Sequence, residues 1–369
     1  MLTTEDVIPF LLEQRCLTRK HVVDGALSVL DASRRNRNFK VINENGPSYF
    51  LKQGVGSERS STVAHEAGIY RFLQAIPGYQ QEVAEFMPRF HRYVPEQGIL
   101  VLELCREGQS LIEFFQLHNG VPQYWAKLLG KALGKLHKLT GREEIRKSYH
   151  KKLTSFMPFA FQLPCLNLKI LAHISGANFE LIKIINQSEE FCQLLEEIKK
   201  EWQYDALIHG DLRWDNCNVF SGSDFAPQKR LKIVDWEMAV LGDSCWDLGT
   251  VFGEYLNFWL LSTPLTKETE PQQFLQLAAY PLKKLQPSVR AFWESYRRQV
   301  KLDPAQSGNK LLRAVKYAGL KLIQAAYEGM QLHTKPTAQV IYLLQLSLNI
   351  LKRPHEASVQ LLGLPFASS

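Results

Sequence analysis

The sequence has 369 residues, enough for two lobes of roughly 100 and 250 residues that each bury a hydrophobic core. Hydrophobic residues make up 45% and charged residues 22%, a balance typical of globular proteins that excludes disordered and fibrous classes. The formal net charge is +7, and this mild basic excess is consistent with anionic partners such as nucleotides, acidic peptides or polyanions, or with a solvated basic surface.

The first 104 residues predict a small, mainly antiparallel β lobe with one helix. Short apolar runs between turn residues predict strands at 26–30, 39–42, 49–52, 90–94 and 99–104. A helix is expected from about Ser61 to Leu73, because Glu66, Ile69 and Leu73 share one helical face. We expect residues 1–104 to form a nucleotide-binding lobe.

Residues 105–369 predict a larger, mainly helical lobe. From Gln123 onward apolar residues recur at helical spacing, and residues 140–203 and 255–350 are expected to supply helices that bind an acceptor. Two short apolar pieces, 206–209 and 231–235, are expected as strands and run straight into polar residues. The fold class is therefore α+β and bilobal, with chemistry expected within residues 205–250.

The strongest chemical signal lies at the ends of those two strands. His209-Gly-Asp211-Leu-Arg213-Trp-Asp215-Asn216 is followed, nineteen residues after Asn216, by Asp235 in Ile233-Val-Asp235-Trp-Glu237. Phosphoryl transfer needs a carboxylate that accepts the proton of the attacking hydroxyl, and oxygen ligands that hold Mg²⁺ against the nucleotide phosphates. Asp211, Asn216 and Asp235 supply these groups in a spacing that allows them to meet.

This pattern resembles the catalytic core of aminoglycoside phosphotransferases and choline kinases, which parallels that of the protein kinases. The resemblance implies a bilobal, protein-kinase-like fold and a kinase that uses ATP and Mg²⁺. It also implies that Asp211 is the catalytic base, with Asn216 and Asp235 as metal ligands. It covers residues 26–250 by motif and the later helices by architecture alone.

Three further residues of this segment have expected roles around the catalytic loop. By resemblance His209 supports the loop, and Asp247, in Gly242-Asp243-Ser-Cys-Trp-Asp247-Leu-Gly249, braces it from a helix start. Arg213, two positions after Asp211, is expected to cover the transferred phosphate, and the alternative is a surface arginine.

The first lobe contains the expected nucleotide contacts. Lys52 ends a strand and Glu66 lies fourteen residues later on the helix, which matches the kinase pair that positions the α/β-phosphates. Ser33 lies in the loop Ser33-Arg-Arg-Asn-Arg-Asn38, which is expected to contact phosphate although it lacks a glycine-rich motif. The hinge candidates Glu103, Leu104 and Cys105 would read adenine through backbone atoms, which leaves ATP and GTP both open.

Three functions are consistent with these residues. The first is a kinase for a hydroxyl of a small molecule, and the second is a kinase for Ser/Thr hydroxyls of a peptide, such as a ribosomally made precursor. The third is a catalytically silent nucleotide-binding protein, which the presence of Lys52, Asp211, Asn216 and Asp235 disfavours.

Other classes of partner are not expected. No run approaches the ~18 apolar residues of a membrane-spanning helix, and the acidic N-terminus lacks a cationic leader, so a cytoplasmic location is predicted. No long Lys/Arg run interleaved with aromatic residues predicts nucleic-acid binding. The six cysteines include no C-x-x-C pair, so neither a zinc site nor a disulfide framework is expected.

Overall fold

The computed structural model describes residues 1–24, 27–120, 122–150, 157–163, 174–221, 229–264 and 277–366. The chain folds into two compact units, Met1–Leu111 with Asp215–Ala239, and Ile112–Trp214 with Val240–Ser369. Each unit is described by itself. The lobes 1–104 and 105–369 expected from the sequence remain a prediction.

The first unit is built on a five-stranded antiparallel sheet with strand order β1-β2-β3-β5-β4. Its strands are β1 Leu27–Asp31, β2 Arg37–Asn43, β3 Tyr49–Gln53, β4 Phe90–Val94 and β5 Ile99–Glu103. All five strands match expected segments, although Ala26, the expected start of the first, lies outside the described residues. The register Lys52↔Leu100 between β3 and β5 places Lys52 on the central strand.

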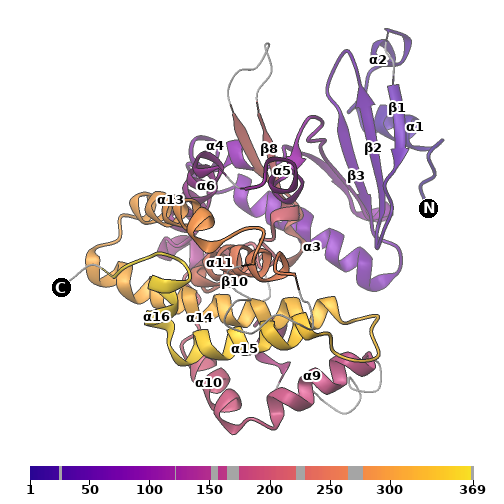
Figure 1. Cartoon of the computed structure of the whole chain (residues 1–369). Helices are drawn as coiled ribbons and strands as arrows, with labels where there is room; N and C mark the ends of the chain where they lie inside the picture. The colour runs from indigo at the N-terminus through magenta and orange to yellow at the C-terminus, as the bar shows by residue number, and fades with distance from the viewer. Residues whose placement is uncertain are drawn as a thin grey trace. The chain divides into compact units, whose positions relative to one another are not determined.

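Side chains alternate between the two faces of this sheet along each strand. A different helix covers each face. One face carries buried residues that pack with Val7, Phe10 and Leu11 of α1 Val7–Glu13, and they are Phe39, Val41, Tyr49, Leu51, Ile99 and Val101. Lys52 points to the opposite face, where its amine reaches Glu66 of α3 Ser57–Gln74. In Figure 1 the strands β1, β2 and β3 lie side by side at this part of the unit.

A second, three-stranded sheet completes the first unit, in the order β6-β8-β9. It comprises β6 Gln109–Ser110, β8 Cys217–Phe220 and β9 Arg230–Ile233. Polar residues, among them Asn216 and Asp235, lie at the open end of the β8–β9 hairpin.

The first unit also contains short helical elements. They are α2 Arg19–Asp24, α4 Tyr79–Glu82, η1 Ala84–Phe86, η2 Pro95–Gln97, η5 Trp214–Asn216 and η6 Trp236–Met238, with η5 spanning the border of the two units.

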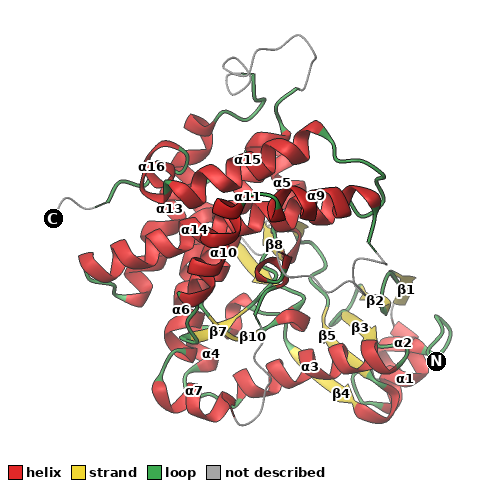
Figure 2. Cartoon of the chain, turned by 90° about the horizontal axis from the view of Figure 1, so that it is seen from below, coloured by secondary structure: helices red, strands yellow, loops and turns green. Residues whose placement is uncertain are grey.

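The second unit is mainly helical, as Figure 2 shows by colour. Its helices are α5 Leu111–His118, α6 Gln123–Thr140, α7 Glu143–His150, η3 Phe159–Phe161, α9 Gly176–Asn186, α10 Glu189–Lys200, α11 Ser244–Leu261, α13 Leu282–Val300, α14 Pro304–Gly329, α15 Ala338–Lys352 and α16 Pro354–Gln360. Two short strands, β7 Ala206–Ile208 and β10 Val240–Gly242, pair in antiparallel fashion. The strand β7 leads directly into residues 209–216, which we call the catalytic motif because the sequence predicts catalysis there. Within the described residues, none of the helices is both long and apolar enough to cross a membrane.

Close helix packing in the second unit depends on glycines. A Cβ at Gly130 of α6 would lie 2.3 Å from the carbonyl oxygen of Phe292 on α13. A Cβ at Gly249 of α11 would lie 2.6 Å from the Cβ of Tyr317 on α14. Both distances are too short for real atoms, so these helices approach as closely as they do because glycine stands there.

Candidate active site

Asn216 and Asp235 lie together at the open end of the β8–β9 hairpin. Cys217 pairs with Ile233, and the Val234 N–H donates to the carbonyl oxygen of Asn216 at 2.9 Å. Asp235 has the left-handed backbone conformation φ 65°, ψ 63°, which Asp tolerates better than most residues. The sheet therefore turns abruptly at Asp235, immediately beside Asn216.

Lys52 lies among three carboxylates of the first unit. Its Nζ is 2.8 Å from Glu66 Oε2, 2.6 Å from Asp235 Oδ1 and 2.8 Å from Glu237 Oε2. The Lys52 side chain is only 7% exposed and that of Glu66 only 1%, whereas Asp235 is 42% exposed. Because a buried ammonium is costly unless it is paired, these carboxylates are what allows Lys52 to occupy a central strand.

Glu66 connects the lysine to the backbone that follows Asp235. Its Oε2 accepts from Lys52, and its Oε1 accepts from the Trp236 N–H at 3.2 Å. Burial raises the pKa of Glu66, and the neighbouring Asp235 and Glu237 raise it further against the opposing effect of Lys52. Burial would lower the pKa of Lys52, but Glu66, Asp235 and Glu237 together raise it above its ordinary value. The raised pKa of Lys52 therefore reflects the surrounding carboxylates, whereas that of Glu66 reflects burial first and these carboxylates second.

This excess and the donor atoms fit a divalent cation. One carboxylate oxygen from each of Glu66, Asp235 and Glu237 lies within 4.8 Å of the others. Three carboxylates face one ammonium, so the cluster carries two surplus negative charges when all groups are ionised. Hard oxygen donors are the ligands that Mg²⁺ and Ca²⁺ prefer, and the Asn216 amide beside Asp235 is a further donor of this kind. Glu237 is the member of this cluster that sequence reasoning missed.

The three hinge candidates differ in whether their backbone N–H groups already have a hydrogen-bond acceptor. The Glu103 N–H donates to Arg89 O at 2.8 Å, and the Leu104 N–H donates to Ser48 O at 3.0 Å. For the Cys105 N–H, no acceptor is found among the described residues. The Glu103 side chain is also engaged, since it accepts from Lys232 Nζ at 2.6 Å. Of the three N–H groups, that of Cys105 is the one available to an adenine ring.

The loop that contains Ser33 is closed on itself by hydrogen bonds. The Ser33 N–H donates to Asp31 Oδ1 at 2.8 Å, and Ser33 Oγ accepts from the Asn38 N–H at 3.1 Å. The side-chain hydrogen bond from Ser33 is the main cause that lowers the pKa of Asp31. An anionic Asp31 at this position opposes a phosphate, so contact between Ser33 and the nucleotide remains a prediction without structural support.

In the second unit, the backbone around Asp211 is fixed by its neighbours. Gly210 has φ 80°, a conformation that a side chain would disfavour, which explains a glycine directly before Asp211. The Asp211 N–H donates to Nδ1 of the buried His209 at 3.3 Å, and Trp246 Nε1 donates to the Gly210 carbonyl at 3.0 Å. The Asp211 side chain is 24% exposed, so its carboxylate is accessible to a substrate.

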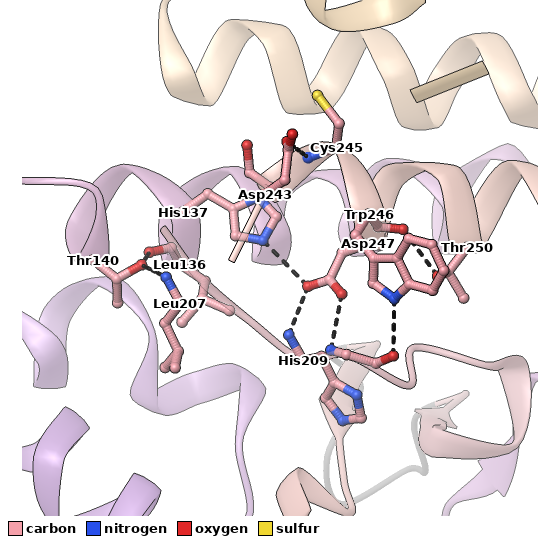
Figure 3. Close-up of polar contacts among 12 residues, drawn as sticks. Leu136, His137, Thr140, Leu207, His209, Asp243, Cys245, Trp246, Asp247 and Thr250 are labelled. Atoms are coloured by element: carbon pink, nitrogen blue, oxygen red, sulfur yellow. Dashed lines mark hydrogen bonds and ion pairs between the residues drawn. The ribbon is translucent and has the colours of Figure 1, made fainter. Parts of the chain in front are cut away.

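Asp247 holds the same segment from the first turn of α11 (Figure 3). Its Oδ2 accepts from the His209 N–H at 2.8 Å and its Oδ1 from the Gly210 N–H at 3.1 Å. His137 Nε2 of α6 lies 3.3 Å from Oδ2. Asp247 is fully buried, and the support roles predicted for it and for His209 require these contacts.

Arg213 lies between two carboxylates of the second unit. Its Nε is 3.5 Å from Asp211 Oδ1, and its Nη1 is 3.5 Å from Glu328 Oε2 on α14. The predicted site residues are thus found in two groups. Lys52, Glu66, Asn216 and Asp235 belong to the first unit, and His209, Asp211, Arg213 and Asp247 belong to the second.

Comparison with known proteins identifies a family. The sequence profile of the phosphotransferase enzyme family matches residues 27–292. Among curated proteins, none matches this chain.

Solved structures share the fold over nearly the whole chain. A choline kinase from Cryptosporidium parvum Iowa II is 16% identical, with 98% of this chain and 99% of that chain covered and a TM-score of 0.57. An amicoumacin kinase in complex with AMP-PNP, Ca²⁺ and Ami is 14% identical, with 95% and 96% covered and a TM-score of 0.54. A choline/ethanolamine kinase family protein from Mesorhizobium loti is 16% identical, with 96% and 95% covered and a TM-score of 0.50. The predicted fold class, α+β and protein-kinase-like, is confirmed.

Proposed function

Because this chain belongs to the phosphotransferase enzyme family, we propose that it moves the γ-phosphoryl group of ATP, with Mg²⁺, to a hydroxyl group of a small molecule. The membership confirms the predicted enzyme class, a kinase with an alcohol acceptor. The proposal concerns the nucleotide, the metal and the acceptor. The observation that carries it is the cluster of Lys52, Glu66, Asp235 and Glu237, which offers an ammonium for phosphate and carboxylates for a cation.

The proposed reaction assigns a step to each group. The acceptor hydroxyl oxygen forms a bond to the γ-phosphorus while the bond from that phosphorus to the β,γ-bridging oxygen breaks and ADP leaves. Asp211 accepts the hydroxyl proton, Lys52 holds the α/β-phosphates, and Glu66 positions Lys52. Asn216, Asp235 and Glu237 would hold Mg²⁺, which when bound neutralises phosphate charge.

The nature of the acceptor is narrowed by the acidic residues of the second unit. An acceptor that is a polycation, such as an aminoglycoside, needs an acidic pocket, which Glu254, Glu294 and Glu328 of this unit, together with Asp224 of the first, could supply. Asp224 lies outside the described residues. The other three already have partners: Glu254 accepts from the Trp214 N–H, Glu294 pairs with Arg297, and Glu328 pairs with Arg213. An acceptor of lower positive charge is therefore favoured.

The proposal is tested by incubating the purified protein with ATP, Mg²⁺ and a panel of hydroxyl compounds while ADP release is recorded. Choline, ethanolamine and amicoumacin begin the panel because proteins of the same fold are named for them. Serine- and threonine-containing peptides form a second arm, and GTP replaces ATP in a third. Phosphorylation of a small acceptor, identified by mass spectrometry, is the expected result. Phosphorylation of peptides alone would overturn the proposed acceptor class.

A further inference from the structure

Helix α14 carries a row of polar side chains that the amphipathic pattern of the helix does not explain. Lys321, Gln324 and Glu328 follow one another at i, i+3 and i+7, which places them on the same side of the helix. Lys321 Nζ donates to Gln324 Oε1 at 3.1 Å, and Gln324 Nε2 donates to Glu328 Oε1 at 2.7 Å. The row is therefore a continuous hydrogen-bonded chain that ends on the Glu328 carboxylate.

The first member of the row is a buried amine. Lys321 is 7% exposed, and within the described part of the chain no carboxylate pairs with it. Its Nζ lies 5.3 Å from the centre of the Trp246 ring, where a cation is attracted by the electrons of the ring face. Trp246 is the residue that donates to the Gly210 carbonyl, and Figure 3 shows it beside Asp247 on α11. Lys321 thus contacts a side chain that itself holds the backbone next to Asp211.

Helix packing keeps this row in place. A Cβ at Gly253 of α11 would lie 3.0 Å from the Cβ of Lys321. Gly253 and Gly249 therefore let α14 approach α11 closely over the segment that contains Lys321. The far end of the row, Glu328, is 38% exposed and reaches Arg213. The row is anchored in the core at one end and meets the catalytic motif at the other.

The position of the Arg213 guanidinium depends on two carboxylates, those of Asp211 and Glu328. A guanidinium is planar and has five N–H donors, so Arg213 can contact Asp211 and Glu328 at once. Without Glu328, the attraction of Asp211 would lose this counterpart and draw the guanidinium toward the carboxylate that has to accept a proton. With Glu328 present, Arg213 is held at 3.5 Å from both.

We propose that Glu328 is a positioning residue for phosphoryl transfer: it holds the Arg213 guanidinium in the pose that faces the transferred phosphoryl group and leaves Asp211 accessible. Gln324 fixes the Glu328 carboxylate, and Lys321 fixes Gln324. This inference rests on the proposed function, in which Asp211 is the base, and on the contact between Arg213 and the transferred phosphate that the sequence predicts.

The variant Glu328→Gln tests the proposal, since it keeps the side-chain shape and removes the charge. Glu294→Gln is the matched control, because Glu294 is 40% exposed and pairs with Arg297 of the same helix, α13, and not with Arg213. Turnover is measured as ADP release from ATP and Mg²⁺, with water as the acceptor. We expect kcat to fall about tenfold in Glu328→Gln, within the range for a misplaced group at the reacting centre, with an unchanged KM for ATP. Glu294→Gln should match the parent.

A double mutant separates positioning from a general structural role. In an Arg213→Ala background, Glu328→Gln should cause no further loss of kcat, because residues that act as one unit are not additive. The melting temperature of Glu328→Gln should equal that of Glu294→Gln, since exposed ion pairs contribute little to stability. Unchanged kcat in Glu328→Gln, or a full additive loss in the double mutant, would overturn the inference while an inactive Asp211→Asn variant still supports the proposed function. If Asp211→Asn is as active as the parent, the proposed function fails and the inference with it.

Discussion

The carboxylate of Asp211 is the group on which the proposed chemistry depends. Asp211→Asn keeps the size of the side chain and its place after Gly210 but removes the ability to accept a proton. We expect turnover to fall about a hundredfold or more, the range for loss of a positioned general base, while nucleotide affinity stays unchanged. Steady-state kinetics and titration with a non-hydrolysable ATP analogue measure the two quantities. Equal turnover of variant and parent would remove Asp211 from the mechanism.

Glu237 is the carboxylate whose role was not foreseen. Glu237→Gln should raise the Mg²⁺ concentration needed for half-maximal activity about tenfold, because a neutral amide is a weaker partner for a hard cation than a carboxylate. Asp235→Asn should have at least the same effect, and Asn216→Ala a smaller one.

Glu58→Gln is the control for this comparison, because it removes the same charge from an exposed position in the first turn of α3. Its Mg²⁺ dependence should match that of the parent. If Asp235→Asn alone shifts the Mg²⁺ dependence, Glu237 is a partner of Lys52 and not of the metal.

The sequence could predict most of this cluster but not its third carboxylate. Motif spacing indicated Asn216 and Asp235, and the helical position of Glu66 indicated its pairing with Lys52. Glu237 stands two residues after Asp235, and its side chain reaches Lys52 only because β9 ends at Ile233 and the chain enters the turn η6 through the left-handed Asp235. That backbone conformation belongs to the folded turn and is not encoded in residue spacing.

At the scale of elements, α11 holds the backbone of His209 and Gly210 through Asp247. Asp247→Asn would replace an acceptor of two buried N–H groups by an amide with only one oxygen. We expect a loss of about 3 kcal/mol in the free energy of unfolding, since a buried donor left without its charged acceptor carries its full desolvation cost. Denaturant titration measures it.

Asp303→Asn is the control for the Asp247 variant. Asp303 is the N-cap of α14, a position where Asn caps as well as Asp. The free energy of unfolding of the Asp303→Asn variant should therefore stay near that of the parent. Equal stability of Asp247→Asn and Asp303→Asn would show that the contacts of Asp247 do not brace the loop.

The elements that sequence analysis missed are those whose stability comes from tertiary contacts. The helix α1 has seven residues and no side-chain cap, and Val7, Phe10 and Leu11 are buried in a cluster with residues of the sheet. The strand β8 has four residues, too few for a clear alternation. The expected helix 61–73 is longer in the structure, where α3 begins at Ser57, because its first turn is polar and follows Gly56, whose φ is 84°.

At the scale of the whole molecule, the resemblance to aminoglycoside phosphotransferases and choline kinases is confirmed as family and fold. The acceptor was not predictable, because it depends on which side chains of many helices remain unpaired after folding. Arg213 and Glu328 are separated by more than one hundred residues in the sequence, and their contact follows from the packing of α14 against α11.

The regulation of the enzyme is also a property of the whole chain. Only eleven residues separate Asp235 from Asp247, which is too short for the long activation segment of a regulated protein kinase, and no Ala-Pro-Glu follows. Trp236 and Glu237 replace the Phe-Gly of such kinases, and Gly210 replaces the arginine that would bind a phosphorylated loop.

We therefore expect the unmodified protein to be active without prior phosphorylation. The contact that phosphorylation assembles in many protein kinases, between the strand lysine and the helix glutamate, is already present here, with Lys52 Nζ 2.8 Å from Glu66. Glu66 also holds the Trp236 N–H, so the backbone after Asp235 is fixed by the same carboxylate. Treatment with a phosphatase, verified by mass spectrometry, should leave turnover unchanged relative to a sample treated with inactivated phosphatase. A large loss of turnover after dephosphorylation would show that a switch exists outside the motifs that normally form it.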